Sequence, residues 1–190
     1  MAWLPYALKT KEKNMSFNIQ ASRPQVNFEF CKDDEKISEA IESIFPMLTE
    51  NAFLAWNYIS IPLNYKYDIS IIIEDVLQML KTIRESSDGG KLEVSWPSNT
   101  FACDWTLIWD KSDLLIKANW RNVVGNTEHL LNASGDVNIS VIEFASEWKM
   151  VLEVLIKGLE ACNYTSTQLK DMDFLYREFS LIETYGSLYR

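Results

Sequence analysis

The sequence has only one histidine, His129, and three cysteines, Cys31, Cys103 and Cys162, among its 190 residues. A metal site built from several histidines is therefore excluded, and no two cysteines have the CxxC spacing of a zinc or redox motif. An odd number of widely spaced cysteines also argues against a disulfide framework and for a reducing compartment. These residue types predict a cytoplasmic protein with no metal or other cofactor.

Motifs for catalysis are also missing. The sequence has no glycine-rich phosphate loop, no GxSxG motif and no calcium loop. Gly89 and Gly90 precede a strand pattern rather than a helix, so they indicate a turn. His129 lies in a polar loop and Cys103 on an apolar face, and no motif supplies either with a catalytic partner. We expect no catalytic residues, and we expect that the chain is not an enzyme.

Long apolar runs and basic clusters are absent too. No run approaches the roughly 18 residues of a membrane span. The N-terminus lacks the basic start and apolar core of a secretory signal. The net charge is −9, and the lysines and arginines are scattered. Because nucleic-acid binding needs a positive field, we expect neither a nucleic acid nor a membrane as partner. An acidic surface instead attracts basic proteins by raising the association rate.

Enough apolar residues are present to build one domain. The hydrophobic fraction is 47%, and it includes seven tryptophans. A chain of 190 residues fits a single domain with a short extension. We expect residues 1–14 to form a flexible N-terminal extension and residues 15–190 to form the domain. Met15 is an alternative start of the native chain.

The clearest pattern is the stretch from Thr100 to Arg121. Apolar and polar residues alternate on both sides of the short polar segment Asp110–Asp113, which is the pattern of an antiparallel hairpin. One face would be buried, and it carries Phe101, Cys103, Trp105, Leu107, Trp109, Leu114, Ile116, Ala118 and Trp120. Residues 91–96 alternate as well and add a third strand. The three strands form a predicted meander rich in tryptophan.

Helices and further strands surround this meander. The i, i+3, i+4 spacing of apolar residues predicts helices over 37–45, 69–83, 141–159 and 167–185. The third begins with a capping box from Ser140 to Glu143, and Asp33 or Asp34 would cap the first. Strands are expected over 25–31, 52–63 and 136–139. The fold class is therefore α+β: a mainly antiparallel sheet with a central tryptophan-rich meander, packed by about four helices including two C-terminal ones.

An acidic stripe is the candidate partner-binding surface. Glu35, Glu39 and Glu42 follow i, i+4, i+7 spacing on the polar side of the first predicted helix, and Asp33 and Asp34 precede them. Such a stripe is often only a solvated helix face, but it could also dock a basic partner. Asp171 and Asp173 are the second choice. A further candidate is the polar face of the meander, which carries Glu93, Asp104, Thr106, Lys117, Asn119 and Arg121.

Three segments carry a resemblance to a known group of proteins. They are Asp104–Trp109, Ile116–Asn122, and Gly135–Ser140 with Glu143 and Phe144. A tryptophan-rich meander followed by this start of a long helix resembles bacterial immunity proteins of polymorphic toxin and contact-dependent growth inhibition systems. The resemblance covers about residues 90–160. It implies a stoichiometric inhibitor that binds a cognate toxin C-terminal domain, often a basic nuclease, and it carries over no binding residue.

Two other functions remain open at this stage. The first is a non-catalytic adaptor or regulatory subunit that dimerises through the polar sheet face. The second is an enzyme without a known motif, which a deep pocket with converging polar groups would indicate. The sequence leaves the oligomeric state and the identity of the toxin open.

Overall fold

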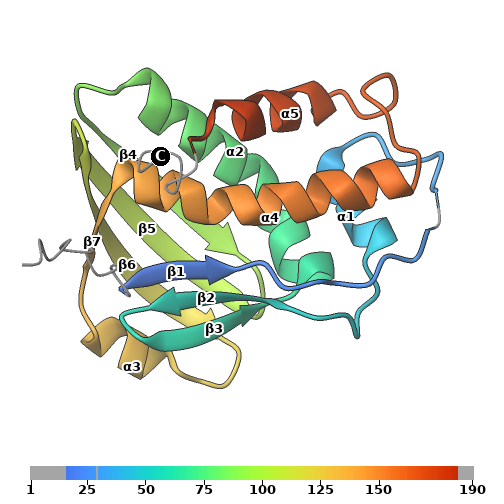
Figure 1. The fold of residues 1–190 in the computed structure, drawn as a ribbon. Helices are drawn as coiled ribbons and strands as arrows, with labels where there is room; N and C mark the ends of the chain where they lie inside the picture. Colours follow the sequence, from blue (N-terminus) through green and yellow to red (C-terminus); the bar gives the residue numbers. More distant parts are fainter. Residues whose placement is uncertain (1–15, 29, 184–190) are drawn as a thin grey trace, which may run out of the picture.

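The computed structural model describes residues 16–28 and 30–183 and has the predicted α+β fold (Figure 1). Its strands form two antiparallel sheets, with orders β1-β2-β3 and β4-β5-β6-β7. The strands are β1 (Phe17–Gln20), β2 (Ala52–Trp56), β3 (Ile59–Leu63), β4 (Gly90–Pro97), β5 (Phe101–Asp110), β6 (Asp113–Val123) and β7 (Val137–Ser140). The predicted extension over residues 1–14 and the alternative start at Met15 lie outside the described residues.

The predicted meander is confirmed as β4, β5 and β6. The turn between β5 and β6 contains Lys111 and Ser112, and Trp105 pairs with Val94 on one side and Ala118 on the other. The short strand β7 adds an edge beside β6. The polar face of this sheet is open, as predicted: Glu93, Lys117, Asn119 and Arg121 are exposed, and Asp104 and Thr106 are half-buried.

The prediction of a first strand over residues 25–31 is wrong. The strand is β1, whose apolar residues Phe17 and Ile19 are buried. Residues 25–27 pair with no strand, because the chain here bonds to the end of the first helix: Asn27 N–H donates to the backbone oxygen of Ile44, the last residue of that helix, at 2.8 Å. Phe28 has a φ of 50°, which no strand residue adopts.

The prediction of one strand over residues 52–63 is also wrong, because this segment is the hairpin β2–β3. Asn57 and Tyr58 form its two-residue turn, with φ values of 44° and 69°. Two positive φ values are those of a type I′ turn, whose twist suits a tight hairpin. Pro62 lies on β3, an edge strand, where its missing N–H costs no ladder bond in the middle of a sheet.

Five α-helices and one π-helical turn complete the described chain. They are α1 (Ile37–Ile44), η1 (Tyr65–Ile69), α2 (Ser70–Glu85), α3 (Glu128–Ala133), α4 (Val141–Ala161) and α5 (Met172–Leu181). The predicted capping box of α4 is present. The N-cap of α1 is Lys36, so neither Asp33 nor Asp34 caps it. The last helix is shorter than predicted, since residues 165–171 form turns.

A cluster of tryptophans joins the two sheets to α4. Trp105 on β5 lies 4.5 Å from Trp96 and 5.5 Å from Trp56 between ring centroids, and Trp148 of α4 packs edge-on against Trp96 at 6.2 Å. Trp120 closes the cluster against Trp56 at 5.3 Å. All five side chains are buried, which confirms the prediction for Trp105 and Trp120. Figure 1 shows α4 crossing the molecule, with α2 and α5 on one side and β1 on the other.

Gly90, the first residue of β4, has no room for a side chain. A Cβ at Gly90 would lie 2.4 Å from the ring of Trp109, and Gly90 has no positive φ, so only space restricts this position. Trp109 is held there because its Nε1–H donates to Ser86 O at 2.6 Å. We therefore expect Gly90→Ala to lower the free energy of unfolding by about 1–3 kcal/mol through overpacking.

Urea unfolding of four proteins tests this: the native chain, Gly90→Ala, Trp109→Leu and the double variant. Because the clash is with the indole ring, the cost of Gly90→Ala should largely disappear when Trp109 is already leucine. An equal cost of Gly90→Ala in both backgrounds would contradict the steric explanation.

Candidate functional site

The acidic stripe predicted from the sequence is exposed. Glu35 precedes α1, and Glu39 and Glu42 lie on its outer side. Glu39 also has a structural role, because its carboxylate accepts the backbone N–H groups of Glu35 at 2.9 Å and Lys36 at 3.2 Å. These two hydrogen bonds lower the pKa of the Glu39 carboxyl. Glu35 and Glu42 are thus the members of the stripe that can be changed without disturbing the helix start.

Asp34 differs from its neighbours, because the structure places it inside the protein. It is 8% exposed, whereas Asp33 is exposed. The Tyr164 hydroxyl donates to Asp34 Oδ2 at 2.5 Å, and the Ser43 hydroxyl donates to Oδ1 at 3.2 Å. Burial and the Asp34 carboxylate raise the pKa of Tyr164. The assignment of Asp34 to an exposed docking stripe is therefore corrected: its carboxylate connects α1 to the chain after α4.

A polar hollow of about 270 Å³ opens between α1 and η1. It is lined by Asp34, Glu39, Glu42, Ser43 and Lys66. The Lys66 ammonium group donates to the backbone oxygen of Glu42 at 2.5 Å. The lining residues of the hollow therefore include three carboxylates and one amine, the Lys66 ammonium group bound to a backbone oxygen. Its size and charge suit the end of a lysine or arginine side chain from another protein.

Exposed apolar residues lie beside this hollow. Leu48 is 94% exposed and Met47 is 59% exposed, both in the turn that follows α1. The turn is held close to η1 because the side-chain amide of Asn64 donates to Met47 O at 3.2 Å. Protein–protein interfaces usually combine large apolar side chains with a polar or charged rim, and both are present here. Sequence periodicity alone could not identify them, since the turn belongs to no amphipathic element.

The second pair of candidates lies at the same end of the molecule. Asp171 is the half-buried N-cap residue of α5, and exposed Asp173 accepts a hydrogen bond from the Ser166 hydroxyl. The turn that contains Ser166 is attached to the loop before α1, because Gln168 Nε2 donates to Cys31 O at 3.1 Å. The structure therefore places the start of α5 close to the loop that leads into α1, at the right of Figure 1.

The histidine and the two buried cysteines show no arrangement that indicates catalysis in the part of the chain that the structure describes. His129 is exposed on α3, and the described residues hold no group of three side chains suited to a metal ion. Burial raises the pKa of the Cys103 thiol, so it is a packed residue rather than a nucleophile. Burial also raises the pKa of Cys162. These thiols are accounted for by packing.

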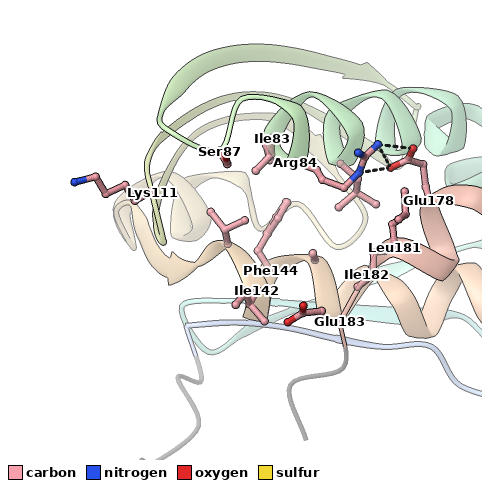
Figure 2. Close-up of a pocket in the computed structure, with 13 residues that line it drawn as sticks. Ile83, Arg84, Ser87, Lys111, Ile142, Phe144, Glu178, Leu181, Ile182 and Glu183 are labelled. Atoms are coloured by element: carbon pink, nitrogen blue, oxygen red, sulfur yellow. Dashed lines mark hydrogen bonds and ion pairs between the residues drawn. The ribbon is translucent and has the colours of Figure 1, made fainter. Parts of the chain in front are cut away.

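An apolar pocket of about 280 Å³ lies between α2, α4 and α5 (Figure 2). Its apolar wall consists of Leu80, Ile83, Val141, Ile142, Phe144, Ala145, Leu181 and Ile182. Four charged groups, Arg84, Lys111, Glu178 and Glu183, and the hydroxyl of Ser87 complete it. The residues come from three helices far apart in the sequence, so no motif predicts this pocket.

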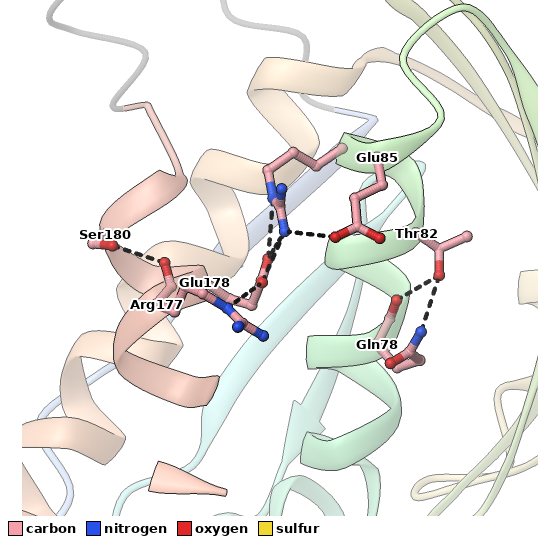
Figure 3. Close-up of polar contacts among 7 residues, drawn as sticks. Gln78, Thr82, Glu85, Arg177, Glu178 and Ser180 are labelled. Atoms are coloured by element: carbon pink, nitrogen blue, oxygen red, sulfur yellow. Dashed lines mark hydrogen bonds and ion pairs between the residues drawn. The ribbon is translucent and has the colours of Figure 1, made fainter. Parts of the chain in front are cut away.

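The wall between α2 and α5 is fixed by an ion pair between half-exposed Arg84 and buried Glu178 (Figure 3). Arg84 Nη2 lies 2.9 Å from Glu178 Oε1, and its Nε donates to Oε2 at 3.3 Å. The Glu178 side chain is only 2% exposed, and Arg177 is more distant, at 3.6 Å. The contact explains why a glutamate stands on the inner face of α5, where the helical pattern alone predicts an apolar residue.

Comparison of the chain with protein-family models, with curated proteins and with solved structures gives no match. Among the described helices, none has the length and apolar composition needed to cross a membrane.

Removal of Arg84 should be costly because it strands a buried carboxylate. We expect Arg84→Met to lower the free energy of unfolding by about 3 kcal/mol, and Arg84→Met/Glu178→Gln to regain part of it. The matched control is Lys157→Met, which removes the exposed pair with Glu153 at 2.5 Å and should cost less than about 0.5 kcal/mol. Urea unfolding measures all three, and equal costs for Arg84→Met and Lys157→Met would contradict the buried-pair explanation.

The lowered pKa of Glu39 predicts a pH-dependent stability. The charged form is favoured in the folded state, so its contribution is complete above the ordinary pKa of 4.5 and is lost as pH falls through the folded pKa. The difference in unfolding free energy between the native chain and Glu39→Gln should therefore be largest near neutral pH and vanish in acid. Glu42→Gln, on the same helix side but without a bond to the helix start, is the control. A Glu39→Gln effect independent of pH would refute the capping role.

Proposed function

We propose that this chain is a non-catalytic inhibitor that neutralises a basic toxin domain by binding it, in the manner of bacterial immunity proteins. The observation that carries the proposal is the hollow at α1, whose lining has three carboxylates and the single amine of Lys66. A basic side chain of the toxin would enter the same hollow. An inhibitor of this kind needs a complementary surface and no reacting groups.

Charge supports this choice of partner. The chain carries 27 acidic and 18 basic side chains, and the first contact with a basic domain would be steered by that excess. Steering by a field of one sign raises association rates by roughly 10- to 1,000-fold at low salt. The acidic residues Glu35, Glu42 and Asp33 would supply the local field at the docking end.

Apolar contact would then hold the complex together. Surface charges screened by salt contribute little to affinity, whereas a few buried apolar anchors contribute most of it. Met47 and Leu48 lie next to the hollow and are largely exposed. In the proposed complex they pack against the toxin, while the carboxylates form the rim and select a basic partner.

Co-expression tests the function. We expect an upstream gene to encode a large secreted protein with a variable C-terminal domain, and that domain to arrest growth of a host cell. Simultaneous expression of this chain should restore growth, and the two purified proteins should form a stoichiometric complex. If the toxin domain kills equally well in the presence of this chain, the proposed function is wrong.

Charge reversal tests the surface. In Glu35→Lys/Glu42→Lys, the association rate with the same toxin domain should fall about 10- to 100-fold at low salt, with a smaller fall at high salt. Glu39 is left in place because it caps α1. Stopped-flow fluorescence measures the rate.

The control for net charge is Asp110→Lys/Asp113→Lys, two exposed residues at the β5–β6 turn. It changes the total charge by the same amount at a different place. Equal slowing by both double variants would mean that only the overall charge acts, and the assignment of the binding surface to α1 would fail.

A further inference from the structure

The pocket between α2, α4 and α5 has the form of a small-molecule site. Its volume is about 280 Å³, and its wall is mainly aliphatic, with the ring of Phe144 on the α4 side (Figure 2). An engineered cavity of about 150 Å³ with a similar lining binds benzene, which gives the scale of ligand that such a space accepts. This pocket has nearly twice that volume.

Its mouth is apolar as well. Ile142 of α4 is 37% exposed and Leu181 of α5 is 48% exposed, and both line the pocket. Water therefore touches a continuous apolar lining from the mouth inwards. A ligand that covers these two side chains gains the free energy of removing their surface from water.

The charges around the pocket cancel. Two cations, Arg84 and Lys111, and two anions, Glu178 and Glu183, line it. Arg84 donates hydrogen bonds from Nε and Nη2 to the Glu178 carboxylate. An anionic ligand would therefore have to compete with that buried carboxylate for the Arg84 guanidinium group. A cationic ligand would face the same competition from Arg84 at Glu178. Because Arg84 and Glu178 are paired, and Lys111 and Glu183 balance each other in sign, the site favours an uncharged occupant.

We propose that this pocket binds a neutral, largely apolar small molecule of about two or three fused or linked rings, or an aliphatic chain of similar size. The site is independent of the acidic surface at α1, and it assigns the protein a second, ligand-binding property. Binding closes the mouth over Ile142 and Leu181 and links α4 to α5 through the ligand.

The test uses two dyes with the same ring system on the full chain. N-phenyl-1-naphthylamine is neutral, and 1-anilinonaphthalene-8-sulfonate carries an added sulfonate. We expect saturable fluorescence enhancement with one neutral dye per chain, and at least tenfold weaker binding of the sulfonate. Ligand binding to the folded state should also raise the unfolding temperature in proportion to the logarithm of dye concentration.

Two variants locate the dye. Ala145→Phe fills the pocket from α4, and Ile142→Trp covers its mouth from an exposed position that tolerates a larger side chain. Each should weaken binding of the neutral dye at least tenfold. The matched control is Ala161→Phe, which adds the same side chain at an exposed position near the other end of α4 and should leave binding unchanged.

Four outcomes would overturn the proposal. They are the absence of saturable dye binding, binding that is unaffected by both pocket variants in folded protein, tighter binding of the sulfonate, and binding that appears only after the chain is shortened to end at Glu183. The third would mean that Arg84 selects an anion. The fourth would mean that the chain itself, rather than a ligand, occupies the pocket.

Discussion

The structure depends on the packing of five indole rings against one another. Trp56 comes from the first sheet, Trp96, Trp105 and Trp120 from the second, and Trp148 from α4. Tilted and edge-to-face pairs of this kind contribute about 0.5–1.5 kcal/mol each beyond the burial of their area. Within the described residues, the Nε1 atoms of Trp96, Trp120 and Trp148 have no hydrogen-bond acceptor. Apolar packing has here outweighed the cost of burying indole N–H groups, each about 1–3 kcal/mol.

The tryptophan cluster packs the two sheets and α4 together, and hydrogen bonds attach the surrounding loops to them. Asn57, in the turn of the first sheet, donates to Ser134 O and Gly135 O beside α3, while Trp56 Nε1–H donates to Gly135 O. At the far end of α4, Tyr164 binds Asp34. These bonds attach loops to a rigid centre, so surface residues on the loops can be exchanged for binding without repacking the core.

Secondary-structure elements whose pattern lies within their own segment could be predicted from the sequence. Elements that depend on pairing with residues far away in the sequence could not. Strands β4 to β6 and helix α4 were predictable, because alternation, a capping box and helical spacing are contained in each segment. Residues 25–31 alternate just as well, yet no strand pairs with them, and the pairing partner of Phe17–Gln20 lies more than thirty residues away. The Asn57–Tyr58 turn was missed because its sequence lacks the glycine that usually indicates a type I′ turn.

The same distinction applies to the site. Helical spacing was enough to place Glu35, Glu39 and Glu42 on one exposed side, but the burial of Asp34 depends on Tyr164, which lies 130 residues away in the sequence. The exposure of Met47 and Leu48 depends on the path of the turn after α1. The proposed ligand pocket forms only where α2, α4 and α5 pack together, which no local pattern predicts. The burial of Glu178 in its wall is explained by the ion pair with Arg84.

The two proposed sites lie towards opposite ends of α4. Ala145 borders the pocket, and Ala161 lies close to the loops that carry the acidic residues, so about 24 Å of helix separates them at 1.5 Å per residue. Helix α5 is the better link, because Glu178 lines the pocket while Asp173 faces the acidic end through Ser166. A ligand could therefore influence partner binding only by changing how α5 is docked, and the Arg84–Glu178 pair opposes such a change.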